Sequence, residues 1–325
     1  MWRPLESYLQ GITRVYFSPV DNLHSFPIEY ASMGKGRVCD KWELLRVSST
    51  REIIGQLYKD GRTSAVLYGG LQYDLQRDEL IAVSRQGTYH SSNATRAICN
   101  DELRYKVKYL PGSLSEVTDI AELFTISPCL ITDTVGTEES FKSLDGSSYE
   151  IIHLATHGFF WSENDISKHD NIGFLHNDYF QSLSKEDNAM LRSGLVFSGA
   201  SVFLEGVELP DDIEDGILTA SELSTLNLGK TNLVVLSACD SGLGEISSEG
   251  VFGLQRGFKL AGVKSLLMTL WKVDDQATSM LMKEFYKHYL SGKSKRQSLY
   301  LAQSVLRKSE EFSDPYYWAS FILLD

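Results

Sequence analysis

Cys239 and His157, whose side chains could act together in nucleophilic catalysis, each follow an apolar stretch of the chain. Residues 233–237 read Leu-Val-Val-Leu-Ser and residues 151–155 read Ile-Ile-His-Leu-Ala. Such short runs, ending at small residues and glycine, predict buried parallel strands. Ligands gather at the carboxyl ends of the strands in an open α/β sheet. A thiol at one strand end and an imidazole at another can serve as a nucleophile and its general base. We therefore expect the fold to bring Cys239 and His157 together.

Both residues also have a purely structural interpretation. A free cysteine is often simply buried, but Cys239 is followed by Asp-Ser-Gly, a polar and flexible context that favours a reactive thiol. His157 is followed by Gly158, which lets another backbone or a substrate approach closely. His153 lies four residues earlier, on the same face of the predicted strand. We expect His153 to be a core or supporting residue, since no third ligand has the spacing of a zinc site.

Other kinds of site are not indicated by the sequence. The glycine-rich segment after Cys239 lacks the third glycine of a dinucleotide-binding motif and has Glu245 where a phosphate would approach. No Gly-x-Ser-x-Gly motif surrounds a candidate serine, which argues against a serine hydrolase. We therefore expect neither a metal nor an organic cofactor.

A series of motifs resembles those of the CHAT-type peptidases, caspase-like cysteine peptidases related to caspases, legumain, gingipains and separase. In chain order the motifs are Thr156-His-Gly, Asp215-Gly-Ile-Leu-Thr-Ala-Ser-Glu-Leu, Leu236-Ser-Ala-Cys-Asp-Ser-Gly, Glu249-Gly-Val-Phe-Gly-Leu-Gln-Arg-Gly-Phe, Leu270-Trp-Lys-Val-Asp-Asp-Gln-Ala-Thr and Pro315-Tyr-Tyr-Trp-Ala-Ser-Phe. The resemblance therefore extends over essentially the whole chain.

The resemblance implies a caspase-like α/β/α sandwich with a mostly parallel central sheet, and a cysteine endopeptidase that uses a His/Cys dyad. By resemblance, Cys239 attacks the peptide carbonyl, His157 accepts and later donates the proton, and the N–H groups of Gly158 and Cys239 form the oxyanion hole. No third catalytic residue can be assigned from the sequence. CHAT units usually follow TPR repeats or act with a sensor, and we find no internal repeat here. The resemblance thus implies a latent enzyme in bacterial signalling or defence, activated by a TPR-containing or sensor partner.

Asp274 and Asp275 follow the predicted strand at 263–271 and have two possible roles. Aspartate is a favoured N-cap, and a helix is predicted to begin next to them. Separase-like relatives carry acids in this segment that recognise a basic residue at the P1 position of the substrate. Because one acid is enough for the cap, we expect the other to be available for an acidic S1 pocket.

Composition limits the partners and the compartment. The 325 residues carry a formal net charge of −12, which argues against nucleic acid as the main partner and is compatible with a basic peptide. The four cysteines are widely spaced and include no Cys-x-x-Cys, as expected for a reducing cytoplasm. Neither a signal peptide nor an apolar run of about 20 residues is present, so we expect no membrane association.

Strands and helices alternate along the chain, which is typical of βαβ units and a mostly parallel sheet. We place the peptidase domain at residues 62–325 and an N-terminal extension, which packs on that fold or extends its sheet, at residues 1–61. Within the extension, strands are predicted near residues 12–18, around Ile28 and at 42–47.

Two local patterns complete the prediction. Ser113 and Glu116 have the spacing of a capping box that opens a helix through Phe124. The acidic run 211–215 is expected to be a solvated loop.

Two further functions remain open. The main alternative is a catalytically silent caspase-like scaffold for protein–protein signalling, although the presence of both His157 and Cys239 argues against it. An acyltransferase or thioesterase could use the same pair of residues, but it would need a cofactor pocket for which the sequence offers no sign.

Overall fold

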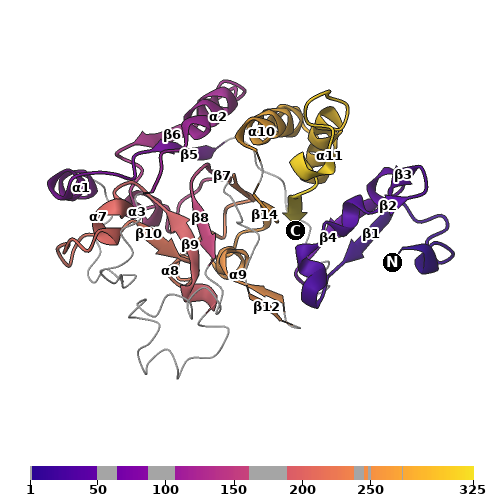
Figure 1. Ribbon diagram of the computed structural model, residues 1–325, viewed down its shortest axis with the longest axis horizontal. Coiled ribbons are helices and arrows are strands. Elements are labelled where there is room, and N and C mark those ends of the chain that lie inside the picture. The colour runs from indigo at the N-terminus through magenta and orange to yellow at the C-terminus, as the bar shows by residue number, and fades with distance from the viewer. Residues whose placement is uncertain are drawn as a thin grey trace.

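An eight-stranded sheet runs through the middle of the molecule (Figure 1). The structure is a computed structural model that describes residues 2–49, 64–86, 107–160, 189–237, 245–247, 250–272 and 274–325. In spatial order the strands are β1 (Arg14–Phe17), β4 (Glu43–Arg46), β15 (Phe321–Leu324), β14 (Ser265–Thr269), β11 (Leu233–Leu236), β7 (Ile151–Leu154), β5 (Ala65–Leu71) and β6 (Cys129–Asp133). Neighbouring strands are parallel except for the pair β14 and β15. The predicted mostly parallel sheet is confirmed.

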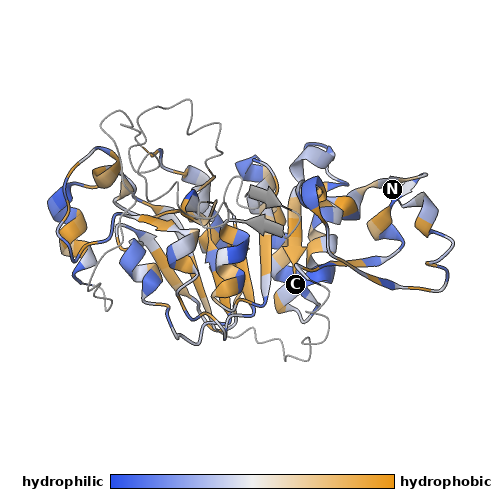
Figure 2. Ribbon diagram, turned by 90° about the horizontal axis from the view of Figure 1, so that it is seen from below, coloured by the Kyte–Doolittle hydropathy of each residue, from blue (hydrophilic) through white to orange (hydrophobic). Residues whose placement is uncertain are grey.

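The central strands are apolar on both faces because helices cover both faces. Successive residues of a strand point to opposite sides, so Val234 and Leu236 enter one core while Leu233 and Val235 enter the other. The first core also contains residues of α3, α8 and α9, and the second contains residues of α2, α10 and α11 (Figure 1). Figure 2 shows the apolar residues concentrated on the central strands. This arrangement confirms the α/β/α sandwich.

The helices begin and end at residues that their sequences mark. α10 is capped by Asp274 and followed by Gly292 at φ 99°, and α11 is capped by the side chain of Ser294. α8 opens with a capping box between Thr219 and Glu222. The helices are α1 (Arg77–Ser84), α2 (Pro111–Ala121), α3 (Glu138–Lys142), α7 (Ala200–Leu204), α8 (Ala220–Leu223), α9 (Leu254–Leu260), α10 (Asp275–Leu290) and α11 (Lys295–Leu306).

Three smaller antiparallel sheets accompany the central one. β8, β9 and β10 form a three-stranded sheet in the order β10-β9-β8, and β2 pairs with β3 and β12 with β13. The bounds are β2 (Ser32–Met33), β3 (Gly36–Arg37), β8 (Gly158–Phe160), β9 (Ser193–Val196), β10 (Ile217–Thr219), β12 (Glu245–Ser247) and β13 (Gly250–Phe252).

Residues 2–49, which we call the N-terminal layer, extend the central sheet through β1 and β4. The strand predicted around Ile28 is wrong, because these residues form a short 3-10 helix. The buried Arg46 explains the fold of this segment: its guanidinium pairs with Glu29 and donates to the carbonyls of His24 and Phe26, which bends the chain around it. The 3-10 helices here are η1 (Arg3–Leu5), η2 (Asp21–Ser25), η3 (Ile28–Tyr30) and η4 (Val38–Asp40), and a further one, η6 (Pro315–Tyr317), precedes β15.

The N-terminal layer also touches the segment that follows Cys239. The hairpin of β12 and β13 lies beside η2.

The domain boundary at residue 61 stays a prediction, although the described part of the layer shares its sheet with the rest of the molecule.

Two local predictions are corrected by long-range contacts. Ser113 does not cap α2, which begins at Pro111; its hydroxyl instead accepts a hydrogen bond from the N–H of Gly70. The acidic run is solvated only at its start, because Glu214 and Asp215 are buried. Both corrections arise from partners that are distant in the sequence.

In the part of the chain that the structure describes, no helix has both the length and the apolar character that crossing a bilayer requires.

Candidate active site

His157 lies three residues beyond the end of β7, at the junction with β8. The chain is fixed on both sides of it: β7 pairs with β5 and β11, and the carbonyl of His157 accepts from the N–H of Val196 in β9 at 2.9 Å. In an antiparallel ladder, hydrogen-bonded and non-hydrogen-bonded pairs alternate. Gly158, opposite Leu195, is therefore a non-hydrogen-bonded position, and its N–H points away from β9.

The imidazole of His157 is held in one tautomer by a backbone carbonyl. Its Nε2 lies 2.7 Å from the carbonyl oxygen of Lys108, and a carbonyl can only accept a hydrogen bond. Nε2 must therefore carry a proton, which leaves the lone pair of the neutral ring on Nδ1. The ring of Tyr73 packs against the imidazole with 5.0 Å between centroids, and its hydroxyl lies 2.9 Å from Thr156 Oγ1.

The surroundings of His157 keep it neutral near pH 7. Burial lowers its pKa below the ordinary value of 6.5, and the positive charge of Lys272 acts in the same direction. The Lys108 carbonyl and the charge of Asp275 oppose this shift without reversing it. A neutral imidazole with a free Nδ1 lone pair can accept a proton from an acid such as a thiol.

Cys239 lies outside the described residues, so the structure places the strand that leads to it but not the thiol. β11 and β7 are parallel neighbours, with Leu236 opposite Leu154, and the N–H of Ser237 donates to the carbonyl of Leu154 at 3.0 Å. The two strands thus end side by side at the same edge of the sheet, as predicted. The N–H of Cys239, expected in the oxyanion hole, also lies outside the described residues.

The two adjacent acids occupy different environments. Asp274 is the N-cap of α10: its Oδ1 accepts from the N–H groups of Gln276 at 2.9 Å and Ala277 at 3.1 Å. Asp275, the first residue of the helix, is exposed, and its charge acts on His157, where it partly opposes the lowering of the imidazole pKa by burial. It also lies beside Gly112 in the first turn of α2, where a Cβ atom would be 3.5 Å from the Cβ of Asp275.

The second histidine of β7, His153, is fully buried on the side of α2 and α10. Its Nε2 lies 3.0 Å from Glu116 Oε1 and its Nδ1 lies 3.2 Å from the Tyr286 hydroxyl. With both nitrogens engaged by protein groups, His153 is a core residue, as the sequence predicts.

Two groups that contact His157, the Lys108 carbonyl and the Tyr73 ring, could not be recognised as site residues from the motifs alone. The Lys108 carbonyl could not be found, because every residue has a backbone carbonyl and only the fold selects one. Tyr73 lies two residues beyond β5, which ends with Gly69-Gly70-Leu71. This pair of glycines at a strand end was the one sequence feature that could have drawn attention to Tyr73.

Among the described residues, one cluster of acids has the spacing of metal ligands: Glu138, Glu214 and Glu222. The ammonium group of Lys142 already lies among them, at 2.7, 2.9 and 3.1 Å from their respective carboxylates. The cluster therefore contains its own cation and is a structural ion-pair network.

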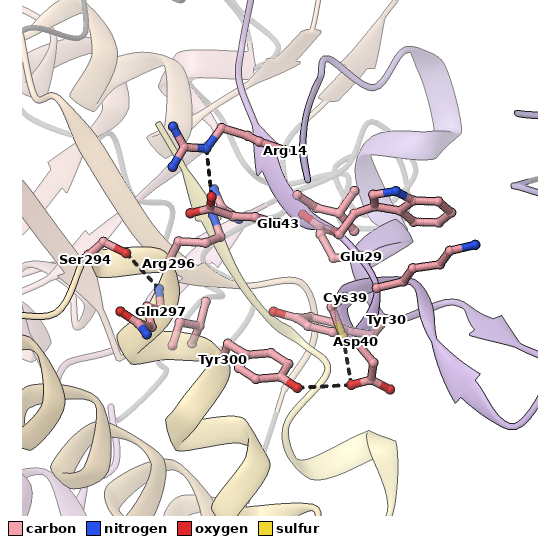
Figure 3. A pocket seen from close by; sticks show the side chains of 14 residues that line it. Arg14, Glu29, Tyr30, Cys39, Asp40, Glu43, Ser294, Arg296, Gln297 and Tyr300 are labelled. Carbon is pink, nitrogen blue, oxygen red and sulfur yellow. Dashed lines mark hydrogen bonds and ion pairs between the residues drawn. The ribbon is translucent and has the colours of Figure 1, made fainter. Parts of the chain in front are cut away.

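A cavity of about 560 Å³ lies away from His157, between the N-terminal layer and α11 (Figure 3). Two of the acids that line it are paired, Glu43 with Arg14 at 2.7 Å and Asp40 with Arg307 at 2.9 Å. None of the predicted site residues lines this cavity, so the candidate active site is defined by the strand ends around His157.

Comparison with curated proteins finds relatives that are much longer than this chain. Tetratricopeptide repeat protein 28 of Homo sapiens is 27% identical over 256 residues, which cover 73% of this chain and 10% of that protein. The protein of the same name from Mus musculus is 37% identical over 108 residues, which cover 33% of this chain and 4% of that protein. The chain thus spans a tenth or less of the length of either relative.

Comparison with solved structures and family models identifies the fold and the family. The Arg-specific cysteine proteinase gingipain R is similar with a TM-score of 0.50 and 7% identity, over 99% of this chain and 65% of that one. The separase–securin complex of Saccharomyces cerevisiae matches with a TM-score of 0.47 and 10% identity, over 93% of this chain and 14% of that one. The chain has a caspase-like fold. The model of the CHAT domain matches residues 1–324, and the chain therefore belongs to the CHAT domain family.

Proposed function

We propose that the chain is a caspase-like cysteine endopeptidase whose dyad is His157 and Cys239. The observation that carries the proposal is the parallel register of β7 and β11. Leu154 lies opposite Leu236, and each candidate residue follows its strand by three positions. The neutral, oriented imidazole of His157 adds the base that a thiol nucleophile needs.

In the proposed reaction, Nδ1 of His157 takes the proton of the Cys239 thiol and the thiolate attacks the carbonyl carbon of the scissile peptide. The resulting oxyanion is stabilised by the N–H groups of Gly158 and Cys239. The C–N bond then breaks, the leaving amine takes the proton from His157, and a thioester remains on Cys239. Water, deprotonated by His157, hydrolyses the thioester and releases the carboxylic acid and the free thiol.

We also propose that the S1 pocket contains Asp275 and prefers arginine or lysine at P1. Asp274 is used by the cap of α10, whereas Asp275 is exposed and within electrostatic reach of His157. A carboxylate that pairs with an arginine in a closed pocket forms charge-assisted hydrogen bonds of about 1.5–3 kcal/mol. This corresponds to roughly a tenfold to hundredfold preference over a neutral P1 residue.

The proposed enzyme is latent until a partner with TPR repeats or a sensor domain engages it. Support comes from the names of the two curated relatives, which are tetratricopeptide repeat proteins. High turnover of a cognate substrate by the purified chain alone would contradict latency.

The test of the dyad is covalent labelling with a peptide acyloxymethyl ketone that carries arginine at P1, followed by peptide mapping. We expect the label on Cys239, and we expect it to disappear in the Cys239→Ala and His157→Ala variants. Cys39→Ala, which removes a half-buried thiol in the N-terminal layer, is the matched control and should label normally. If the partner-bound chain takes no label at Cys239, the catalytically silent scaffold is the correct interpretation.

A further inference from the structure

The Lys108 carbonyl that orients His157 lies in the short segment 107–110 that leads into α2. The position of this oxygen decides which nitrogen of the imidazole is protonated. Ser113, in the first turn of α2, connects this segment to the central sheet.

The hydroxyl of Ser113 makes two hydrogen bonds that link strand and segment. It accepts from the N–H of Gly70 at 2.9 Å and donates to the carbonyl of Leu110 at 2.7 Å. The N–H of Ser113 donates to the same carbonyl at 3.1 Å. Leu110 is two residues from Lys108, so the buried Ser113 hydroxyl holds the end of β5 against the turn that presents the Lys108 carbonyl.

The packing around this hydroxyl leaves α2 little freedom to shift. A Cβ atom at Gly69 would lie 2.5 Å from the carbonyl oxygen of Ser113, and one at Gly70 would lie 2.8 Å from Cβ of Leu114. Gly70 also has a φ of 65°, which favours glycine. The two glycines thus let the first turn of α2 lie directly on the strand end.

β5 is also the neighbour of β7, the strand that leads to His157, with Tyr68 opposite Leu154. Both partners of the hydrogen bond between His157 and Lys108 are therefore positioned relative to β5. β5 positions His157 through its pairing with β7, and it positions the Lys108 carbonyl through the hydrogen bonds of Ser113.

We propose that Ser113 is a positioning residue that sets the tautomer of His157 through the Lys108 carbonyl. It does not contact the substrate. Without its hydroxyl, the N–H of Gly70 and the carbonyl of Leu110 lose this partner and the segment 107–110 can shift. The imidazole then also populates the tautomer with a proton on Nδ1, in which Nδ1, the nitrogen proposed to take the proton of the Cys239 thiol, has no lone pair to accept it.

This inference rests on the proposed function for its kinetic consequence but not for its structural one. Residues that orient metal-bound histidines from outside the ligand shell change activity by about tenfold to a hundredfold when removed, and we expect the lower end of that range for a residue that acts through a backbone carbonyl. We expect kcat to fall about tenfold in Ser113→Ala, with KM nearly unchanged, because substrate contacts remain. Ser115→Ala is the matched control: its exposed hydroxyl, in the same turn, donates to the Gly112 carbonyl at 2.9 Å.

The decisive measurement is the tautomer of His157, read from the ¹⁵N chemical shifts of its ring in histidine-labelled protein. The wild type and Ser115→Ala should carry the proton on Nε2, and Ser113→Ala should show a shift of the signals towards a mixture. Ser113→Thr and Ser113→Val have side chains of the same shape, and only the former keeps a hydroxyl. We expect the wild-type tautomer in Ser113→Thr and the mixture in Ser113→Val.

An unchanged tautomer in both Ser113→Ala and Ser113→Val would overturn the positioning role. A chain that cleaves nothing, even with its partner, would refute the proposed function while the tautomer measurement still decides this inference.

Discussion

Replacing Lys142 by methionine should destabilise the protein strongly, because it removes the cation that pairs with three buried acids. Lys142 pairs with Glu138, Glu214 and Glu222, and the three carboxylates lie within 4.8 Å of one another. Loss of one partner of a buried ion pair costs about 3–5 kcal/mol. Because three acids depend on Lys142, we expect a value at the upper end, a large fraction of a typical folding stability of about 5–15 kcal/mol.

The stability lost on replacing Lys142 should grow as the pH rises. In the wild type, burial already raises the pKa of Glu138, and the negative charge of Glu222 adds to this effect. Burial likewise raises the pKa of Glu214. An acid whose pKa is higher in the folded state stabilises the fold below its unfolded pKa, and this contribution disappears as the pH rises through the folded value. Without Lys142 both pKa values rise further. The difference between variant and wild type should therefore be smaller at pH 5 than at pH 8.

The measurement is urea-induced unfolding followed by circular dichroism at pH 5, 6.5 and 8. Lys283→Met is the control, because Lys283 pairs with Asp119 at a similar distance of 2.8 Å but on the surface, where we expect no measurable loss. The reasoning would be refuted if Lys142→Met and Lys283→Met unfolded at the same urea concentration, or if the effect of Lys142→Met did not change with pH.

Three further predictions concern the candidate site and Cys39. Because burial lowers the pKa of His157, the imidazole stays an effective base below pH 6.5; kcat/KM should fall only at more acidic pH, and a midpoint above 6.5 would contradict this. Asp274→Ala should lower stability by about 1 kcal/mol through loss of the cap without changing P1 preference, whereas Asp275→Asn should reduce cleavage after arginine with little change in stability. Assays on matched arginine and leucine peptides, with thermal unfolding alongside, separate the two effects. Burial raises the pKa of Cys39 to about 11, so iodoacetamide should alkylate it slowly at pH 7.5; rapid alkylation in the folded protein would show that this thiol is not buried.

The central sheet could be predicted because its strands are marked by local composition. Residues such as 233–236 and 151–154 are continuous apolar runs bounded by polar or small residues, and burial on both faces requires that pattern. The ends of two helices are also marked by local composition: Gly262 and Gly292 follow α9 and α10 at φ 93° and 99°, a conformation that glycine adopts without strain.

The errors share a different origin, namely pairing over long sequence distances. The spacing of Ser113 and Glu116 matches a capping box, but their side chains bind Gly70 and His153 instead. Glu214 lies in an acidic run that looks solvated, and only the fold brings Lys142 to it. In the same way, the strand ends of the candidate site were predictable, whereas the choice of the Lys108 carbonyl as the partner of His157 was not.

The place of β15 in the sheet has a consequence for the order of folding. β15 lies between β14 and β4, and in the described sheet it is the one link that joins β1 and β4 to the other strands. It follows them by about 275 residues, so at a typical synthesis rate of 5–20 residues per second β1 and β4 wait roughly 15 to 55 seconds for their neighbour. During that time they can rely on the small core around Trp2, Val38 and Trp42. A chain interrupted before Phe321 would leave its first two strands with no sheet to join, an exposed edge of the kind that invites pairing with other chains.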